Sequence, residues 1–242
     1  MKIGVAQTRP IKGNIRSNIK QHKKLIDLAV AHGADTIIFP ELSITGYEPE
    51  LAAFLATTPD DSRFDDFQNI SNARQITIGI GVPTRASKGI CITMNLFRPH
   101  QSRQTYSKKY LHQDEEPFFV SGQSTLSFIG EKSNAALAIC YEISVAEHAE
   151  NAFKHGAETY IASVAKSVKG MDKAMERLAE IAKKYTMYVL MANCVGYCDN
   201  FDCGGKTAVW NKQGFLLGQL NDTDEGILIL NTDTQEVIQK TV

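Results

Sequence analysis

The feature that most constrains the fold is an alternation of short apolar runs with helix-like segments. Residues 2–7 and 35–39 are apolar runs of strand length, and the segment between them has apolar residues at helical spacing. Asn14 is suited to cap this helix, which should run to about residue 32, and Gly33 is suited to end it. The pattern returns in the second half, with strands expected at 135–139, 159–164 and 187–192 and helices from about Val145 to before Gly156 and at 171–185.

Further β-rich runs have no helix between them, and they occupy residues 76–82, 90–97, 104–107, 207–210, 215–220 and 226–230. Strand–helix alternation combined with such runs is typical of layered α/β proteins. The sequence therefore predicts an α/β layered sandwich with a mixed sheet.

Composition narrows the class of protein. Hydrophobic residues make up 43% of the 242 residues and charged residues 22%, as in soluble globular proteins. No linker or short repeat divides the chain, so we expect a single domain over residues 1–242. The net charge of −1 argues against a nucleic acid partner. No apolar run reaches the roughly 18–20 residues that cross a bilayer, and no signal-peptide pattern is present, so we expect no membrane partner and a cytoplasmic location.

The five cysteines raise the question of disulfides or a metal site. An odd number in a chain of this length does not suggest a disulfide framework. Cys194, Cys198 and Cys203 lie close together in the sequence, but no fourth Cys or His is nearby. We therefore expect buried or loop thiols there, and no metal.

Three chemically useful side chains directly follow expected strands. Glu41 comes soon after the 35–39 run, Lys108 after 104–107 and Cys140 after 135–139. Because sites in open α/β sheets gather at the carboxyl ends of strands, these residues are candidates for one site. Taken alone, each has a simpler interpretation: a loop carboxylate, a solvated ammonium and a small buried thiol.

Each of these positions also suits a chemical role. Cys140 lies where a strand should pass into a helix, and the backbone N–H of Tyr141 could receive an oxyanion there. Partial burial of Glu41 would raise its pKa and make it a usable base near neutral pH. The ammonium of Lys108 would favour a thiolate and could hold an oxyanion.

The order glutamate, lysine, cysteine, with its flanking residues, resembles the nitrilase superfamily of carbon–nitrogen hydrolases. Each matching segment is short, but the ordered set is specific, and the resemblance runs from residue 2 to about 231. The matching segments are Phe39–Leu42 with Thr45–Tyr47, Tyr106–Lys108 with Leu111, Ile139–Glu142, Asn193–Gly196 and Gly204–Thr207. The resemblance implies an α-β-β-α layered sandwich with mixed sheets. It also selects Lys108 over Lys109, because Tyr106 and Leu111 fit the family's spacing around its lysine.

The resemblance further implies how the residues act. Cys140 is expected to form a thioester acyl-enzyme, Glu41 to transfer protons, and Lys108 with the Tyr141 N–H to stabilise the tetrahedral intermediate. No metal or organic cofactor is expected. Relatives often carry a second glutamate after the lysine; we favour Glu115 for it, with Glu116 as the alternative.

Two departures from the family's pattern bear on the substrate. The arginine that often follows the nucleophile is missing, and Ser163–Ser167 stands where many relatives have Pro-Ala-Ala-Trp. Lys166 in this segment could contact an acidic group of a substrate, although a solvated lysine is the simpler interpretation. The loops at 47–60, 112–122 and 165–171 should shape the pocket, and their sequences do not name the substrate.

We expect a hydrolase that cleaves a non-peptide C–N bond in a small amide and releases ammonia or an amine. The alternatives are an N-carbamoyl amine hydrolase or a true nitrilase and, from another class, a non-catalytic binding protein with the same fold. Relatives pair through the helix after the nucleophile, so a homodimer with contacts from Val145–Phe153 is expected.

Overall fold

The computed structural model describes residues 1–123, 128–129 and 135–242. Their strands form a seven-stranded sheet of order β15-β14-β1-β2-β3-β4-β5, a six-stranded sheet of order β13-β12-β9-β8-β7-β6, and the hairpin β10-β11. The strands of the seven-stranded sheet are β1 (Lys2–Gln7), β2 (Thr36–Ile38), β3 (Thr77–Ala86), β4 (Gly89–Phe97), β5 (Gln104–Ser107), β14 (Gly226–Asn231) and β15 (Val237–Thr241). The other strands are β6 (Phe128–Ile129), β7 (Ala135–Ile139), β8 (Thr159–Ser163), β9 (Tyr188–Ala192), β10 (Val195–Cys198), β11 (Phe201–Gly204), β12 (Ala208–Trp210) and β13 (Leu216–Gln219).

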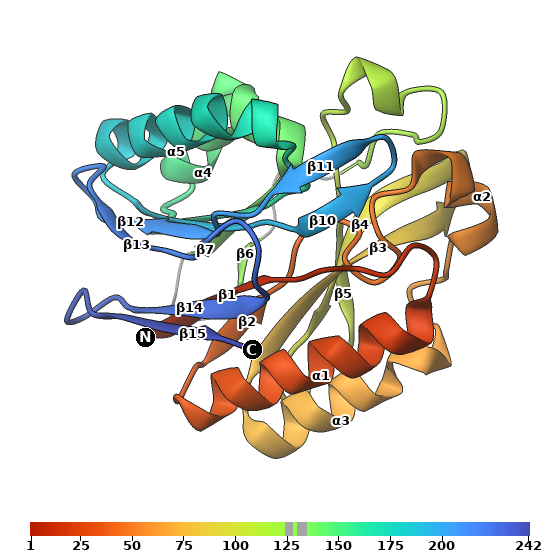
Figure 1. Cartoon of the computed structure of the whole chain (residues 1–242), viewed down its shortest axis with the longest axis horizontal. Helices are drawn as coiled ribbons and strands as arrows, with labels where there is room; N and C mark the ends of the chain where they lie inside the picture. The colour runs from red at the N-terminus through yellow and green to blue at the C-terminus, as the bar shows by residue number, and fades with distance from the viewer. Residues whose placement is uncertain (124–127, 130–134) are drawn as a thin grey trace.

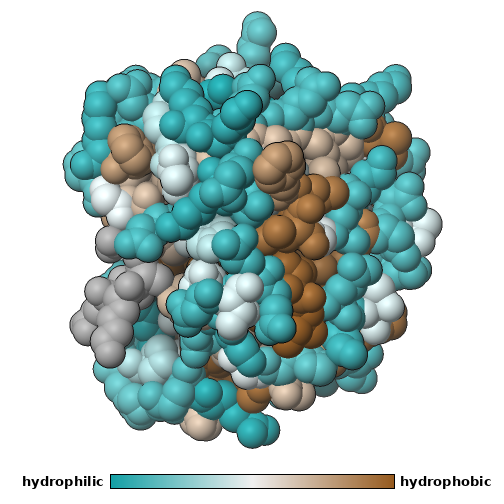
Figure 2. All heavy atoms as spheres, turned by 90° about the vertical axis from the view of Figure 1, so that its left-hand side faces the viewer, coloured by the Kyte–Doolittle hydropathy of each residue, from teal (hydrophilic) through white to brown (hydrophobic). Residues whose placement is uncertain are grey.

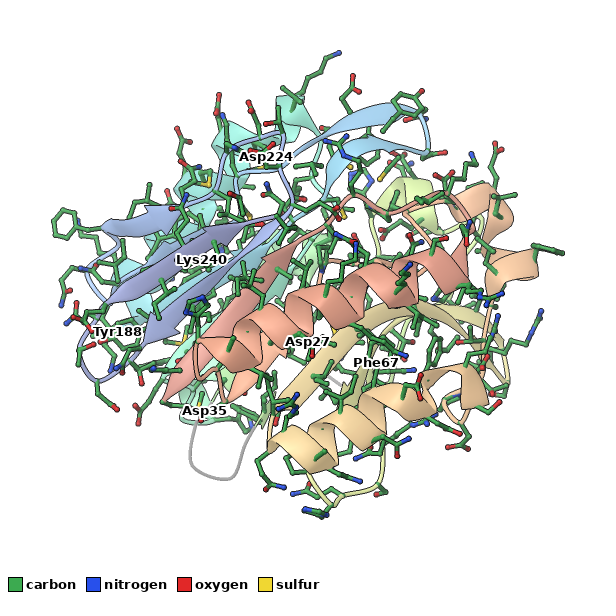
Figure 3. All side chains as sticks on the ribbon, turned by 60° about the horizontal axis from the view of Figure 1, so that its bottom comes forward. Asp27, Asp35, Phe67, Tyr188, Asp224 and Lys240 are labelled. Carbon is green, nitrogen blue, oxygen red and sulfur yellow. The ribbon has the colours of Figure 1, made fainter. Side chains whose placement is uncertain are left out.

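The two sheets face each other, and helices cover their outer sides (Figure 1). The longer helices are α1 (Ile15–Ala31), α3 (Asp65–Arg74), α4 (Ala146–Lys154) and α5 (Met171–Tyr185), and α2 (Ala52–Leu55) is a single turn. α1 and α3 pack on the seven-stranded sheet through an apolar cluster that includes Phe67, labelled in Figure 3. α4 and α5 cover the six-stranded sheet. The expected α-β-β-α sandwich is confirmed.

Strand direction brings the candidate residues to one edge. β2 is parallel to β3, β4 is antiparallel to β3, and β5 is antiparallel to β4. β2 and β5 therefore run in the same direction, and their carboxyl ends, which precede Glu41 and Lys108, lie at the same edge of the seven-stranded sheet. In the six-stranded sheet, β7, β8 and β9 are parallel, and Cys140 follows the carboxyl end of β7.

Most expected elements occur with the expected bounds. Asn14 Oδ1 accepts a hydrogen bond from Ser17 N at 3.1 Å and so caps α1, and Gly33 follows the helix with φ of +73°. α3 was not expected, because only Phe67 and Ser71 of its ten residues are buried and no clear apolar face marks it. The hairpin β10–β11 and the edge strand β15 were also not expected.

The surface of the described residues indicates whether the chain could enter a membrane and where hydrophobic side chains gather. Within the described ranges, no helix is long and apolar enough to cross a bilayer. The face shown in Figure 2 is mainly hydrophilic; hydrophobic side chains form one continuous strip near its centre and smaller separate groups elsewhere. The helix expected to mediate dimer contacts forms α4 and leaves Phe153 49% exposed, against the ring of Tyr185; the homodimer itself stays a prediction.

Candidate active site

Glu41, Lys108 and Cys140 come together where strand ends of the two sheets meet. Glu41 and Lys108 belong to the seven-stranded sheet, and Cys140 follows β7 of the six-stranded sheet. Lys108 Nζ donates a hydrogen bond to Glu41 Oε1 at 2.8 Å, and both side chains are fully buried. The charges of both residues act on the Cys140 thiol: Glu41 raises its pKa and Lys108 lowers it.

The backbone at Cys140 is strained. Its φ is +43°, in the left-handed region that residues other than glycine seldom adopt. Cys140 begins a short 3-10 helix (Cys140–Ser144) directly after β7, so the chain turns sharply at this residue. Such strain at a strand-to-helix turn is a feature of nucleophilic residues, because the turn presents the side chain to the substrate.

Glu41 lies in a tight turn packed directly against β3. The turn is anchored by a hydrogen bond from Ile44 N to Gly81 O at 3.1 Å. A Cβ at Gly81 would lie 2.4 Å from both Leu42 N and Pro40 O, so only glycine allows this approach. The position of the Glu41 carboxylate therefore depends on a residue of the neighbouring strand.

The structure brings Glu115, and not Glu116, to Lys108. Glu115 Oε1 accepts hydrogen bonds from Lys108 Nζ at 2.6 Å and from the Tyr47 hydroxyl at 3.0 Å. Its other oxygen accepts from the backbone N–H of His112 at 2.8 Å. Glu116 is exposed, whereas Glu115 is 1% exposed. The ammonium is thus held between two buried carboxylates.

The charges at the site favour a protonated thiol at rest. Burial raises the pKa of Glu41, and the nearby Lys108 ammonium opposes this. Burial disfavours the Lys108 ammonium, but the negative groups around it, Glu41 first, raise its pKa above the usual value. Burial and then the charge of Glu41 raise the pKa of Cys140, and Lys166 and Lys108 do not compensate. The Lys108 ammonium favours the thiolate, as expected, but burial and the charge of Glu41 outweigh it, so the thiol needs a base.

Glu142, which the sequence reasoning did not single out as functional, connects the parts of the site. Its Oε1 accepts a hydrogen bond from Lys109 N at 2.8 Å, directly after the candidate lysine. Its Oε2 accepts from Ile139 N and from the Tyr106 hydroxyl, each at 2.8 Å. This fully buried carboxylate therefore joins the end of β5 to the turn that carries Cys140. The acidic residue two positions after the cysteine was the available signal.

A second buried hydrogen bond joins the sheets beside Glu41. Ser163 Oγ, at the end of β8, donates to Phe39 O at 2.8 Å, and both residues are completely buried. The small side chain at 163, read from the sequence as part of a departure from the family, therefore holds the segment before Glu41 against the six-stranded sheet.

The segment after Cys140 is supported by α5. Arg177 Nε donates a hydrogen bond to Ile143 O at 3.0 Å, so a guanidinium reaches this turn although the sequence lacks an arginine just after the nucleophile. Tyr141 and Lys166 line the same cavity of about 650 Å³, next to this turn. Two of the three residues predicted to bind substrate or oxyanion thus lie on one pocket wall, and the third, Glu116, does not line this cavity.

Cys194, Cys198 and Cys203 form a buried cluster of free thiols at the β10–β11 hairpin. Hydrogen bonds from Cys194 and Cys203 lower the pKa of Cys198 to about 4. No group of Cys, His, Asp or Glu within the described ranges is arranged to hold a metal ion. The cluster packs against Tyr47, which donates to Glu115.

Comparison with known proteins identifies the family. A model of the family described as carbon-nitrogen hydrolase matches residues 2–240. The chain belongs to the carbon–nitrogen hydrolase family. As a carbon–nitrogen hydrolase of the nitrilase superfamily it is an enzyme, and the alternative of a non-catalytic binding protein is not supported.

Individual relatives of this carbon–nitrogen hydrolase are distant. It is 24% identical over 247 residues to the glutamine-dependent NAD(+) synthetase of Acinetobacter baylyi, a match that covers 97% of this chain and 44% of the synthetase. The chain therefore spans less than half the length of that relative.

The fold is shared with an amidase from Nesterenkonia sp. AN1. One structure of it, a cysteine-to-alanine variant in complex with butyramide, has a TM-score of 0.84 and 21% identity and covers 95% of this chain and 89% of the amidase. A second, a glutamate-to-glutamine variant with the acetamide moiety of fluoroacetamide added at the active-site cysteine, has a TM-score of 0.85 at the same identity and coverage.

Proposed function

We propose that this enzyme hydrolyses the C–N bond of a small amide through a thioester on Cys140. The observation that carries the proposal is the buried Glu41–Lys108 pair close to a buried thiol on a strained turn. This arrangement combines a base, a fixed cation and a nucleophile, which are the groups that acyl transfer requires.

Acylation begins with transfer of the thiol proton to Glu41. Glu41 Oε2 accepts no hydrogen bond from the described residues, so this oxygen is available to take the proton of the Cys140 thiol. The sulfur then attacks the amide carbon, and the carbonyl oxygen becomes an oxyanion. The Lys108 ammonium and the backbone N–H of Tyr141 stabilise that oxyanion, at about 3 kcal/mol per donor. As the intermediate collapses, Glu41 returns the proton to the leaving nitrogen, and ammonia departs.

In deacylation water is the nucleophile and the Cys140 sulfur is the leaving group. Glu41, again a carboxylate, takes a proton from water, and the hydroxide attacks the thioester carbon. The second intermediate releases the carboxylic acid, and the sulfur regains its proton from Glu41. Glu115 holds the Lys108 ammonium in place throughout through its 2.6 Å hydrogen bond. In this scheme Glu115 orients Lys108, and Glu116 has no role.

The acyl group is expected to be small. The Nesterenkonia amidase, which shares the fold, has been captured with butyramide and with an acetamide moiety on its cysteine. N-carbamoyl amines and nitriles would use the same nucleophile, so they are the alternative substrates. Ammonia release across a panel of amides, carbamoyl amines and nitriles separates the three activities.

Cys140→Ala tests the mechanism. We expect amide hydrolysis to fall by about 10⁴-fold or more, because removal of a nucleophile leaves only binding and oxyanion stabilisation. The melting temperature should stay within a few degrees of the wild type, since one buried sulfur is lost. Cys91→Ala, which removes another buried thiol in β4, is the matched control and should keep its activity. Full activity in Cys140→Ala would refute the mechanism.

A further inference from the structure

Lys166 is held at a fixed position beside the nucleophile. Its backbone N–H donates to Asn193 Oδ1 at 2.8 Å, and its carbonyl accepts from Gly204 N at 2.8 Å. Asn193 is completely buried and also donates to Gly205 O at 2.8 Å, so its amide is itself fixed. The start of the Lys166 side chain therefore has a defined place after the carboxyl end of β8.

The ammonium of Lys166 has no partner among the described residues. Within the part of the chain that the structure describes, no carboxylate forms an ion pair with it and no acceptor receives a hydrogen bond from it. The residue is nevertheless half-buried. Its charge lowers the pKa of Cys140 more than the charge of Lys108 does. A half-buried and unpaired charge close to a nucleophile is costly unless a ligand satisfies it.

The cavity next to Lys166 has an excess of available positive charge. Its wall includes Tyr141 and Lys166 together with Lys173 and Arg177. Two acidic residues also line it, but the Glu180 carboxylate receives Arg177 Nη1 at 3.4 Å. Because Tyr141 directly follows Cys140, this cavity of about 650 Å³ adjoins the turn that carries the nucleophile and could receive the part of a substrate beyond the reacting amide.

We propose that Lys166 binds a carboxylate on the acyl part of the substrate, so that the preferred substrates are monoamides of short dicarboxylic acids. This inference rests on the proposed amide hydrolysis. When the leaving group is ammonia it has no carbon to carry a second charge, so the anionic group must be on the acyl part. An ammonium–carboxylate contact would orient the amide carbon towards Cys140 as well as add affinity.

Matched substrates test this assignment. Succinamate and glutaramate carry the carboxylate, and 4-oxopentanamide and 5-oxohexanamide replace its charged oxygen with a methyl group. The measured quantity is the ratio of kcat/KM for each acid to that for its neutral counterpart, from ammonia release. We expect a ratio of at least about ten in the wild type and a tenfold or greater fall in Lys166→Met, as typical for loss of one charged contact.

Lys169→Met is the matched control, since Lys169 lies in the same loop, is exposed and does not line the cavity. It should keep the wild-type ratio. Calorimetry on Cys140→Ala gives a second readout: glutaramate should bind this variant at least tenfold more tightly than it binds the Cys140→Ala, Lys166→Met double variant. Melting curves confirm that each variant is folded.

The possible failures are distinguishable. A wild-type ratio near one, or an equal loss for acid and neutral amides in Lys166→Met, overturns the role of Lys166 but leaves Cys140-dependent amide hydrolysis standing. If neither charged nor neutral amides release ammonia, the proposed function fails and this inference fails with it.

Discussion

Gly81→Ala should impair the chemistry without touching a catalytic group. The added Cβ would lie 2.4 Å from Leu42 N and Pro40 O, about 1 Å short of ordinary contact. Both atoms belong to the backbone, so no rotation of a side chain relieves the clash. The turn that carries Glu41 must therefore move, and a displacement of about 1 Å can cost about 100-fold in kcat/KM. The clash should also cost about 1–3 kcal/mol of stability.

Gly79→Ala is the control for this experiment, because it adds the same methyl group two residues earlier on the same face of β3. Its Cβ would meet Ile38 Cδ1 at 2.6 Å and Met94 Sδ at 3.0 Å, both ends of flexible side chains. We expect a loss of stability similar to that in Gly81→Ala but less than a fivefold loss of kcat/KM. Steady-state ammonia release and chemical unfolding give the two quantities. Equal losses of activity in the two variants would refute the argument that Gly81 positions Glu41.

Two further predictions concern the buried titratable side chains of Glu115 and His22. Glu115→Gln should lower kcat/KM by about 100-fold by loosening Lys108, and exposed Glu116→Gln should change it less than twofold; the opposite ranking would reverse the assignment. His22 is fully buried, and burial lowers its pKa to about 3. The unfolded chain therefore binds a proton near pH 6.5 that the folded chain does not accept. Stability from this residue is complete above pH 6.5 and falls by about 1.4 kcal/mol per pH unit down to about pH 3. Urea unfolding at several pH values should show a smaller slope in His22→Gln, and an unchanged slope would contradict this linkage.

The layered arrangement could be predicted from the sequence because local residue patterns indicate most of its strands and helices. Apolar runs of strand length and caps such as Asn14 and Gly33 depend on few neighbours. α3 lacks such a pattern, since it is a polar helix that buries little of its surface. The β10–β11 hairpin has a similar difficulty, because its buried cysteines, Cys198 and Cys203, pack with Cys194 and with the distant residue Tyr47.

The site was only partly predictable for a different reason. Strand ends and the order of Glu41, Lys108 and Cys140 can be read along the chain, and direction within each sheet brings the first two together. The raised pKa of Cys140 cannot be read this way, because it comes from burial between the two sheets and from the charge of Glu41, against the opposing charges of Lys166 and Lys108. The sequence likewise left Glu115 and Glu116 open, since adjacent residues in a short 3-10 turn differ only in which one faces inward.

The hydrogen bond from Ser163 to Phe39 and the one from Tyr106 to Glu142 both cross from one sheet to the other. Neither sheet alone contains a complete set of reacting groups, since Glu41 and Lys108 come from one and Cys140 from the other. Activity therefore depends on the relative position of the two sheets. Selection for turnover would then act on apolar residues far from the substrate, wherever they set the spacing between the sheets.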